Sequence, residues 1–378
     1  MIEQAEGVAA RIAGRAREFE ALRRLPDDVA ALLADSGLLS MLTPARYGGA
    51  ELHPAEFFAA IERLARTDAS VAWCCFISNT SCLLAAYLDE AVAAPVFGRR
   101  GLKAAGVFAP RGTARRARDG GREGFRISGR WAWGSFAQHA DVISAGCLIE
   151  GEPGPPVSVL LDRDQVRVLD NWDGVGLAGT GSGEFEVDGA FVPAARCASL
   201  VGGPMGRRTL ARPLYRFPVF GLLALSIAAV AAGIARGAVD ELVALAAGKV
   251  PQGGTRALAQ RPAVQEAVAR AEARLRAARA FALEAVHVGW ATAQHDAPLP
   301  ERERRDLRLA STHLVHQAAA VVDRMFTLAG GSAVFPDSPL QRALRDVHVA
   351  TQHMMVAEST YELTGRLLLG LPTDTAQL

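Results

Sequence analysis

Hydrophobic side chains recur with helical spacing from the N-terminus to about residue 100. One amphipathic helix is predicted to end at Leu22–Arg24, and Pro26 is placed to begin the next, because proline suits the first turn of a helix. Pro54 begins a third helix, and Asp68 is a suitable N-cap for the apolar helix that follows it. We therefore expect an N-terminal helical domain over residues 1–100.

The pattern changes after this segment, where short runs rich in Val, Ile, Phe and Trp are separated by Gly, Pro and Asp. Strands are predicted at residues 124–133, 140–149, 156–162 and 184–193. No helical stretch separates them, so we expect an antiparallel sheet, closed as a small barrel or folded as a sandwich. This middle β-domain is expected to span residues 101–205.

Long helical stretches return in the last part of the chain. They are predicted at residues 217–248, 261–293, 301–329 and 338–370. Four long helices with short links are typical of a four-helix bundle, and we expect this bundle to form a C-terminal domain over residues 206–378. The expected fold is thus mainly α with a central β-domain.

Two stretches, Ala69–Leu88 and Phe217–Ala235, carry no charge and approach the length of a membrane span. The first contains Asn79, Thr80 and several serines, and the second is rich in Ala and Gly. Both are interpreted as buried helices of a soluble protein. We therefore expect no membrane partner.

Charge and cysteine content exclude further classes of protein. The 378 residues carry 41 Lys and Arg against 40 Asp and Glu, so nucleic acid or an anionic membrane would feel no electrostatic attraction. Half of the residues are hydrophobic and 21% are charged, which excludes a disordered chain. Five cysteines without a C-x-x-C pair, and an N-terminus without an apolar signal sequence, favour a cytoplasmic location.

The common nucleotide-binding and metal-binding motifs do not occur with the context they need. G-x-G-x-x-G between a strand and a helix is absent, as is the phosphate-binding G-x-x-x-x-G-K-[ST] loop. His313 and His316 lie three residues apart in a predicted helix, but no third ligand has suitable spacing. We therefore expect no metal.

An ordered set of short motifs runs along nearly the whole chain. The motifs are P-A-R-Y-G-G at residues 44–49, S-G-R-W-A-W-G-S at 128–135, G-L-A-G-T-G-S at 176–182, A-G-G-S at 329–332 and L-Q-R-A-L-R-D-V-H at 340–348. Together they resemble the acyl-CoA dehydrogenase superfamily. The resemblance implies an N-terminal helical domain, a middle β-domain and a C-terminal four-helix bundle.

The position of the catalytic group distinguishes the branches of this superfamily. Dehydrogenases that abstract a proton with a Glu of the last long helix would carry it at the place of Met354, and the nearest acid here is Glu358. A second dehydrogenase branch keeps its Glu elsewhere. His353 instead resembles the histidine of the two-component flavin-dependent monooxygenases, which hydroxylate p-hydroxyphenylacetate and other phenols or oxidise the sulfur of dibenzothiophene.

This resemblance implies the oxygenase component of a two-component monooxygenase. It would take reduced FMN or FAD from a separate flavin reductase, form a C4a-hydroperoxyflavin with O2, and hydroxylate an aromatic or polycyclic phenolic substrate. The family also implies a homotetramer. Three alternatives stay open: an acyl-CoA or acyl-carrier-protein dehydrogenase with FAD, an N-oxygenase of an amino sugar, and a non-catalytic helical scaffold or binding protein.

The resemblance also implies roles for individual residues. His353 would act as a general base with a pKa near neutrality, or would direct the proton on the peroxide, and Ser135 would hydrogen-bond flavin N5. The other expected flavin contacts are Trp133, Phe108, Arg111, Thr180, Ser182, Gly330 and Gly331. The expected substrate pocket contains Trp73, Phe136 and Met354.

Without the resemblance, some of these residues have simpler interpretations. His353, expected in the middle of the last helix, would be a buried imidazole bonded to a backbone carbonyl, and Trp133 would belong to the core of the sheet. Phe136 departs from the family pattern, in which Gly often follows the Ser. The arginines of Glu301–Arg308 are expected on a solvated helix face, and His348 is expected to be structural.

Overall fold

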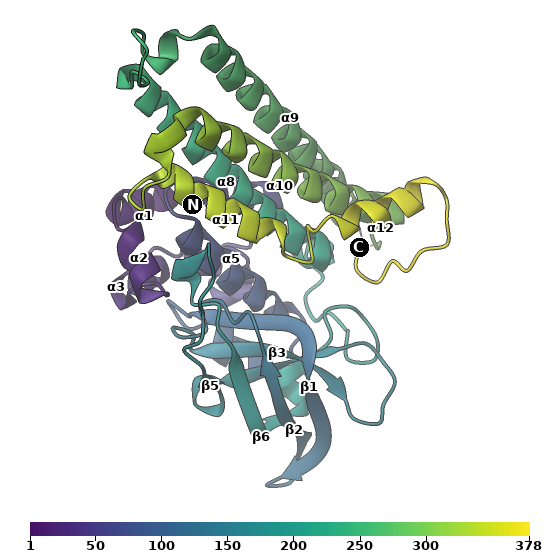
Figure 1. Cartoon of the computed structure of the whole chain (residues 1–378). Helices are drawn as coiled ribbons and strands as arrows, with labels where there is room; N and C mark the ends of the chain where they lie inside the picture. Colours follow the sequence, from purple (N-terminus) through teal and green to yellow (C-terminus); the bar gives the residue numbers. More distant parts are fainter. Residues whose placement is uncertain (296) are drawn as a thin grey trace.

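Helices form both ends of the chain and a sheet forms its middle in the computed structural model, which describes residues 1–295 and 297–378 (Figure 1). The helices are α1 (Ile2–Ile12), α2 (Ala16–Leu22), α3 (Asp27–Asp35), α4 (Pro54–Ala65), α5 (Ala69–Ser81), α6 (Glu90–Phe97), α7 (Pro213–Arg216), α8 (Val219–Gly248), α9 (Pro262–Ala293), α10 (Glu301–Ala329), α11 (Pro339–Thr351) and α12 (Ser359–Leu368). The strands are β1 (Ala104–Asp119), β2 (Arg122–Trp131), β3 (Val142–Ile149), β4 (Val157–Asp162), β5 (Arg167–Val168), β6 (Phe185–Pro193) and β7 (Cys197–Ala198).

The N-terminal helices follow the caps in the sequence, with one correction. The first predicted helix does not run to Leu22–Arg24 without a break, because α1 and α2 are separated at Gly14, whose φ of +79° is left-handed. Pro54 lies in the first turn of α4, as predicted. The Asp68 carboxylate accepts a backbone hydrogen bond at the start of α5 (3.0 Å), which confirms it as the N-cap.

The strands form one seven-stranded sheet in the order β5–β6–β2–β1–β3–β4–β7. The four predicted strands are present as β2, β3, β4 and β6. The expectation of a purely antiparallel sheet is wrong, because β1 and β3 pair in parallel. After β2 has paired with β1, residues 132–141 carry the chain to the opposite side of β1, and a strand added there after two reversals runs parallel to β1. Closure as a barrel or sandwich stays a prediction.

β1, which is not among the four predicted strands, contains one irregularity in its pairing. Its register on β3 shifts between Val107 and Gly112. This irregularity takes Pro110, which has no N–H to donate, out of the regular pairing. At Gly112 an added Cβ would meet the ring of Trp131, so glycine leaves room for the indole in the sheet core.

The C-terminal helices confirm three of the four predicted spans, as α8, α9 and α10. A continuous helix over residues 338–370 is wrong, because residues 352–358 form a turn between α11 and α12, here called the α11–α12 turn. Two side chains of α10, Arg308 and His316, bind backbone carbonyls of this turn at 3.0 and 3.1 Å. The helix can therefore break without leaving these buried carbonyls unsatisfied.

The N-terminal and C-terminal helices share one hydrophobic core, and the sheet has a second. Buried residues make up 94% of the candidate membrane span Ala69–Ala86 and 83% of an apolar 18-residue stretch within the other candidate, Val219–Gly248, as expected of core helices. α5 contacts both α8 and β1, so it lies where the helical body meets the sheet (Figure 1). The division into three domains at residues 100 and 205 stays a prediction.

Candidate active site

The indole of Trp73 connects three segments that are distant in the sequence. Trp73 lies on α5, and its Nε1 donates to Ser135 Oγ in the connection between β2 and β3 (3.2 Å). Its ring centroid lies 6.0 Å from that of His353 in the α11–α12 turn. One residue from each part of the chain therefore meets at this point, and each was singled out from the sequence.

Three buried hydroxyl groups continue from Trp73 into the loop before β6. Ser135 Oγ lies 2.6 Å from Ser182 Oγ, which in turn lies 2.6 Å from Thr180 Oγ1. Thr180 Oγ1 donates to the carbonyl of Leu177 (2.7 Å). We call Ser135, Ser182 and Thr180 the hydroxyl chain. The hydroxyl groups of Thr180 and Ser182 are thus engaged within the protein.

The direction of the hydroxyl chain follows from its two ends. A carbonyl only accepts and an indole N–H only donates, whereas each hydroxyl has one proton. Thr180 gives its proton to Leu177, so it must accept from Ser182, and Ser182 must accept from Ser135. Ser135 Oγ therefore has no proton left to donate, but it keeps one lone pair besides the one that Trp73 occupies. The chain presents an acceptor at Ser135.

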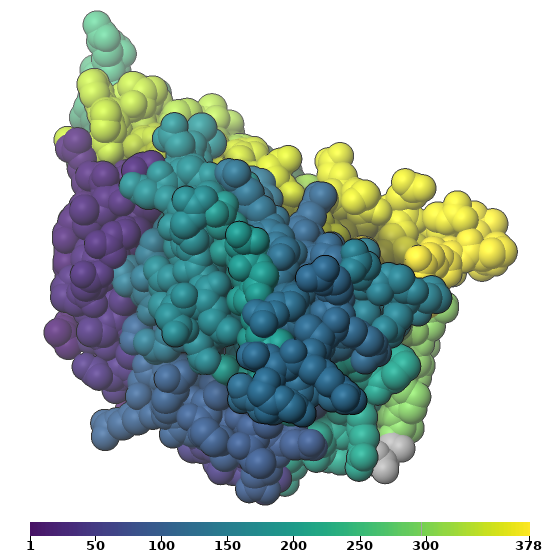
Figure 2. Space-filling model, turned by 90° about the horizontal axis from the view of Figure 1, so that it is seen from below, coloured from purple at the N-terminus to yellow at the C-terminus, as the bar shows by residue number. Residues whose placement is uncertain are grey.

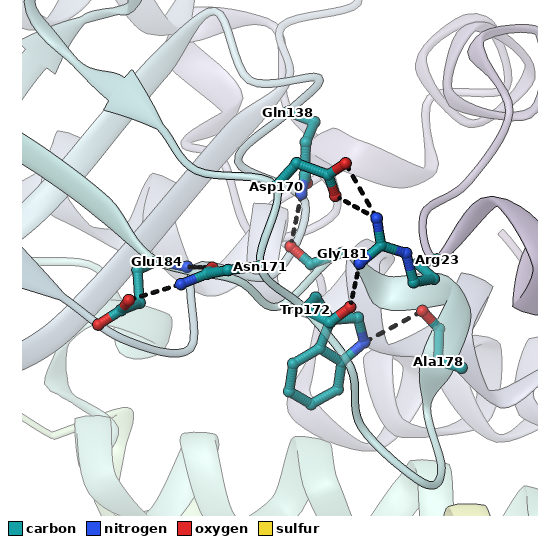
Figure 3. A network of polar contacts seen from close by, with 8 residues as sticks. All are labelled: Arg23, Gln138, Asp170, Asn171, Trp172, Ala178, Gly181 and Glu184. Carbon is teal, nitrogen blue, oxygen red and sulfur yellow. Dashed lines mark hydrogen bonds and ion pairs between the residues drawn. The ribbon is translucent and has the colours of Figure 1, made fainter.

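Polar contacts hold the loop that carries Thr180 and Ser182 (Figure 3). Trp172 Nε1 donates to the Ala178 carbonyl (3.0 Å), and Arg23 of the segment after α2 donates to the Trp172 carbonyl (3.0 Å). Gln138 Nε2, from the β2–β3 connection, donates to the Gly181 carbonyl (2.8 Å). The loop is therefore attached both to the N-terminal helices and to the β2–β3 connection.

His353 lies in the α11–α12 turn, so the expectation that it sits in mid-helix is wrong. Burial, with a contribution from the Arg308 guanidinium, lowers the pKa of His353 from 6.5 to about 4. The expected pKa near neutrality is therefore also wrong, and the imidazole is neutral at pH 7. Its Nδ1 accepts from Met355 N (3.2 Å), so the proton of the neutral ring lies on Nε2. Nε2–H is a donor.

Arg308 is a site residue that the sequence interpretation missed, because it was expected on a solvated face. It is only 1% exposed, and it donates to the Met355 carbonyl (3.0 Å), Thr360 Oγ1 (3.4 Å) and the Gln377 carbonyl. Burial lowers its pKa to about 10. The helical periodicity of the sequence could have indicated this burial. Arg308 precedes the buried residues Ser311, Thr312 and Val315 by three, four and seven positions, so it shares their helix face.

Asp346 is a second missed residue, although its Arg-Asp pair helped to carry the resemblance. Its buried carboxyl accepts from Leu177 N at 2.6 Å, and Leu177 also accepts from the hydroxyl chain. The sequence signal that could have identified Asp346 was the presence of two family motifs, one containing Asp346 and the other containing Leu177. The Arg-Asp motif of α11 and the G-L-A-G-T-G-S motif are in direct contact, as the close approach of Gly176 to the Arg345 backbone shows.

Trp133 does not belong to the sheet core, as the residues alone had suggested. It follows the end of β2 with a left-handed φ of 68°, and 67% of it is exposed. Its ring meets that of Trp172 edge-on at 5.8 Å. Trp131, two residues earlier, fills the core position instead. Trp133 therefore offers an open aromatic surface close in sequence to Ser135.

The remaining predicted flavin contacts are Phe108, Arg111, Gly330 and Gly331, and they differ in their surroundings. Phe108 is partly buried against the helical core, and Arg111 is exposed on β1. Gly330 and Gly331 begin a single helical turn after α10, and Cβ atoms there would meet nothing within 4 Å. Open space therefore borders both glycines.

The expected pocket residues differ in exposure. Phe136 is completely buried, with a left-handed φ of 66° and its ring 5.3 Å from that of His139, so its side chain belongs to the core. Met354 is about half exposed. His348, the structural alternative to His353, is exposed and its Nε2 lies 2.8 Å from Asp323 Oδ1.

Comparisons with known proteins identify the family. Residues 3–94 match the model of the acyl-CoA dehydrogenase N-terminal domain, and residues 225–358 match that of the C-terminal domain. Indole-3-acetate monooxygenase of Pseudomonas putida is 34% identical over 360 residues, which cover 94% of this chain and 90% of that protein. The chain belongs to the acyl-CoA dehydrogenase superfamily.

Other relatives lie in the monooxygenase branch of the superfamily. The flavin-dependent monooxygenase oxygenase subunit HsaA of Rhodococcus jostii is 30% identical and covers 96% of both chains. The structure of XiaF from a Streptomyces species, in complex with FADH2 and glycerol, superimposes with a TM-score of 0.90 at 28% identity and covers 98% of this chain and 95% of XiaF. The resemblance stated from the sequence is confirmed.

The chain has no acid at the position where a dehydrogenase of the last-helix branch is expected to carry its Glu. Met354 occupies the place of the Glu, and Glu358, the nearest acid in sequence, is exposed at the start of α12. The group that faces Trp73 is His353. The ring is a hydrogen-bond donor and not a carboxylate base.

The lowered pKa of His353 predicts how stability depends on pH. Between pH 6.5 and 4 the unfolded chain binds a proton at this histidine and the folded chain does not. The free energy of unfolding of the wild type should therefore fall, relative to that of His353→Gln, as the pH falls through this window. Urea unfolding at pH 7, 5.5 and 4.5 measures the difference. Parallel pH profiles for the two proteins would contradict the prediction.

The positive charge of Arg308 should cause part of the lowering of the His353 pKa. Arg308→Met removes the positive charge, so the pKa of His353 should rise but stay below 6.5, because burial persists. Arg308→Lys keeps the charge and should keep the low pKa. NMR titration of the His353 imidazole measures both, with Arg302→Met on the exposed face of α10 as the matched control. An unchanged pKa in Arg308→Met would exclude the electrostatic role.

Proposed function

We propose that this chain is the oxygenase component of a two-component flavin-dependent monooxygenase that hydroxylates an aromatic substrate with a phenol or indole ring. One observation carries the proposal: Trp73 bonds to Ser135 and faces His353, so an acceptor and a neutral imidazole donor meet at one aromatic ring. The names of the relatives support the reaction class, since they include an indole-3-acetate monooxygenase and a monooxygenase oxygenase subunit.

The residues present fit a reduced flavin. Ser135 offers an acceptor, and N5 of a reduced flavin carries a proton that needs one, whereas N5 of an oxidised flavin offers only a lone pair. Trp133 supplies an exposed aromatic face two residues away, suited to stacking on a planar ring system. The bound reduced flavin would supply, together with O2, the electrophilic oxygen atom. FADH2 in the related XiaF supports this choice of cofactor.

His353 would act on the substrate as a donor. Its Nε2–H can hydrogen-bond the oxygen of a phenol or phenolate and hold the ring in a reactive orientation. A donor to that oxygen stabilises the phenolate, which is the electron-rich form that an electrophilic oxygen atom attacks. Trp73, packed against Phe76 at 4.8 Å, would form the apolar wall behind the ring and exclude water.

The proposed surroundings are those of a soluble assembly. A separate flavin reductase would supply the reduced cofactor, since relatives are named as an oxygenase subunit and an oxygenase component. We propose that both proteins act in the cytoplasm. A homotetramer is proposed from the family resemblance. The C-terminal segment, yellow in Figure 2, projects beyond the body of the protein. The exposed side chains of Leu368 and Leu369 offer apolar surface for association between subunits. The open space at Gly330 and Gly331 would let another subunit approach.

Oxygen incorporation tests the reaction. The protein is mixed with a heterologous flavin reductase, NADH, FMN or FAD and a panel of phenols and indoles under isotope-labelled O2. Mass spectrometry should show one labelled oxygen atom in a panel product.

The alternatives predict other results. Oxidation of an acyl-CoA without labelled oxygen would indicate a dehydrogenase, and a labelled amino sugar would indicate an N-oxygenase. If the protein bound neither oxidised nor reduced flavin, the result would indicate a non-catalytic scaffold protein.

His353→Ala tests the proposed donor. Reduced flavin should still bind, but coupled product formation should fall by about 100-fold, as for other lost oriented donors, while release of hydrogen peroxide rises. His353→Gln, whose amide can donate, should recover part of the coupling. His348→Ala, at an exposed histidine, serves as the control. Unchanged coupling in His353→Ala would remove His353 from the reaction.

A further inference from the structure

Leu177 has an unusual backbone for a branched residue. Its φ of 50° and ψ of 32° place it in the left-handed region, which side chains with a Cβ occupy at a cost. Such a conformation persists where surrounding bonds determine it. The structure shows these bonds on both sides of the residue: Leu177 N donates to Asp346 Oδ1 (2.6 Å), and its carbonyl accepts from Thr180 Oγ1 (2.7 Å) and Trp172 Nε1 (3.3 Å).

Of these three bonds of Leu177, the one to Asp346 comes from outside the loop. Trp172 and Thr180 belong to the same loop as Leu177 and move with it, whereas Asp346 belongs to α11. A second contact fixes the same edge, because Arg345 Nη1 donates to the Val175 carbonyl (2.7 Å). Two contacts from α11 therefore hold the edge of the loop that carries the Leu177 carbonyl, where the hydroxyl chain ends.

We propose that Asp346 is a positioning residue, which holds the hydroxyl chain in its direction by fixing the peptide of Leu177. The structural role of Asp346 is independent of the proposed function, and only its importance for catalysis rests on that function. If the Leu177 carbonyl moves, Thr180 loses its acceptor and the order of the three protons is no longer imposed. Ser135 could then turn its proton outward and present a donor where the proposed site needs an acceptor.

Charges around Asp346 make its state sensitive to pH. Burial, with the nearby carboxyl of Asp68, raises the pKa of Asp346 to about 7, while the Leu177 N–H, Arg342 and Arg345 oppose this shift. Asp68, the N-cap of α5, is itself buried with a raised pKa. An ionised Asp346 accepts the Leu177 hydrogen bond more strongly than the neutral acid does. The hydroxyl chain should therefore tighten as the pH rises.

The indole N–H of Trp73 reports on the chain without any cofactor. In protein labelled with 15N-tryptophan, Trp73→Phe assigns its signal among those of the five tryptophans, and Ser135→Ala marks the resonance without the hydrogen bond. In the wild type, the signal should move with pH around a midpoint near 7. In Asp346→Asn, whose amide oxygen still accepts from Leu177, the signal should lie near the wild-type position but no longer titrate.

Asp346→Leu removes the acceptor and should move the signal toward that of Ser135→Ala. Asp323→Asn, at an exposed acid of α10, is the matched control and should titrate like the wild type. A wild-type signal that is flat near pH 7, titration that persists in Asp346→Asn, or an unmoved signal in a folded Asp346→Leu would each overturn the proposal.

Flavin titration separates this inference from the proposed function. Under anaerobic conditions, the wild type should bind reduced flavin more tightly than oxidised flavin, and Asp346→Leu should reduce that ratio by about ten-fold, the effect of roughly one net hydrogen bond. If the wild type had no affinity for flavin, the proposed function would be refuted, but the NMR result on Asp346 would still hold. Flavin binding with an unchanged ratio in Asp346→Leu would refute the positioning role alone.

Discussion

The hydrogen bond from Trp73 Nε1 to Ser135 Oγ is the interaction on which the proposed site depends. It joins a core helix to the connection that crosses the sheet, and the same indole faces His353 from the other side. The Leu177 carbonyl at the far end of the hydroxyl chain can only accept, so the protons of Thr180, Ser182 and Ser135 all point toward it, and Ser135 is left to accept from the indole, which can only donate. The chemistry that the site can perform follows from that direction.

Much of the fold could be predicted from the sequence, because local patterns determine it. The long helices α8, α9 and α10 and four strands follow from apolar periodicity and turn residues. The parallel pairing of β1 with β3 could not be predicted, since it depends on which side of β1 the chain crosses to. The break after Thr351 depends on side chains of α10 that supply hydrogen-bond donors from a distant part of the chain.

The candidate site was predictable to a smaller extent. The family resemblance pointed to His353, Ser135 and Trp73, and the structure brings these three together. The protonation state of His353 was not predictable, because it results from burial and from an arginine on another helix. Arg308 was missed because a charge-rich stretch is usually solvated, and only its helical spacing relative to buried residues distinguishes it.

Arg308 also bears on the substrate. The structure shows no carboxylate hydrogen-bonded to this buried guanidinium in residues 1–295 and 297–378; its recorded partners are carbonyls and a hydroxyl, and its Nε has none. A positive charge that receives no compensation lowers the pKa of any acid nearby. The charge that adds to the effect of burial in keeping His353 neutral would also favour the phenolate over the phenol beside it. The neutral His353 donor and the Arg308 cation would therefore both stabilise the phenolate, which is the more electron-rich form of the substrate.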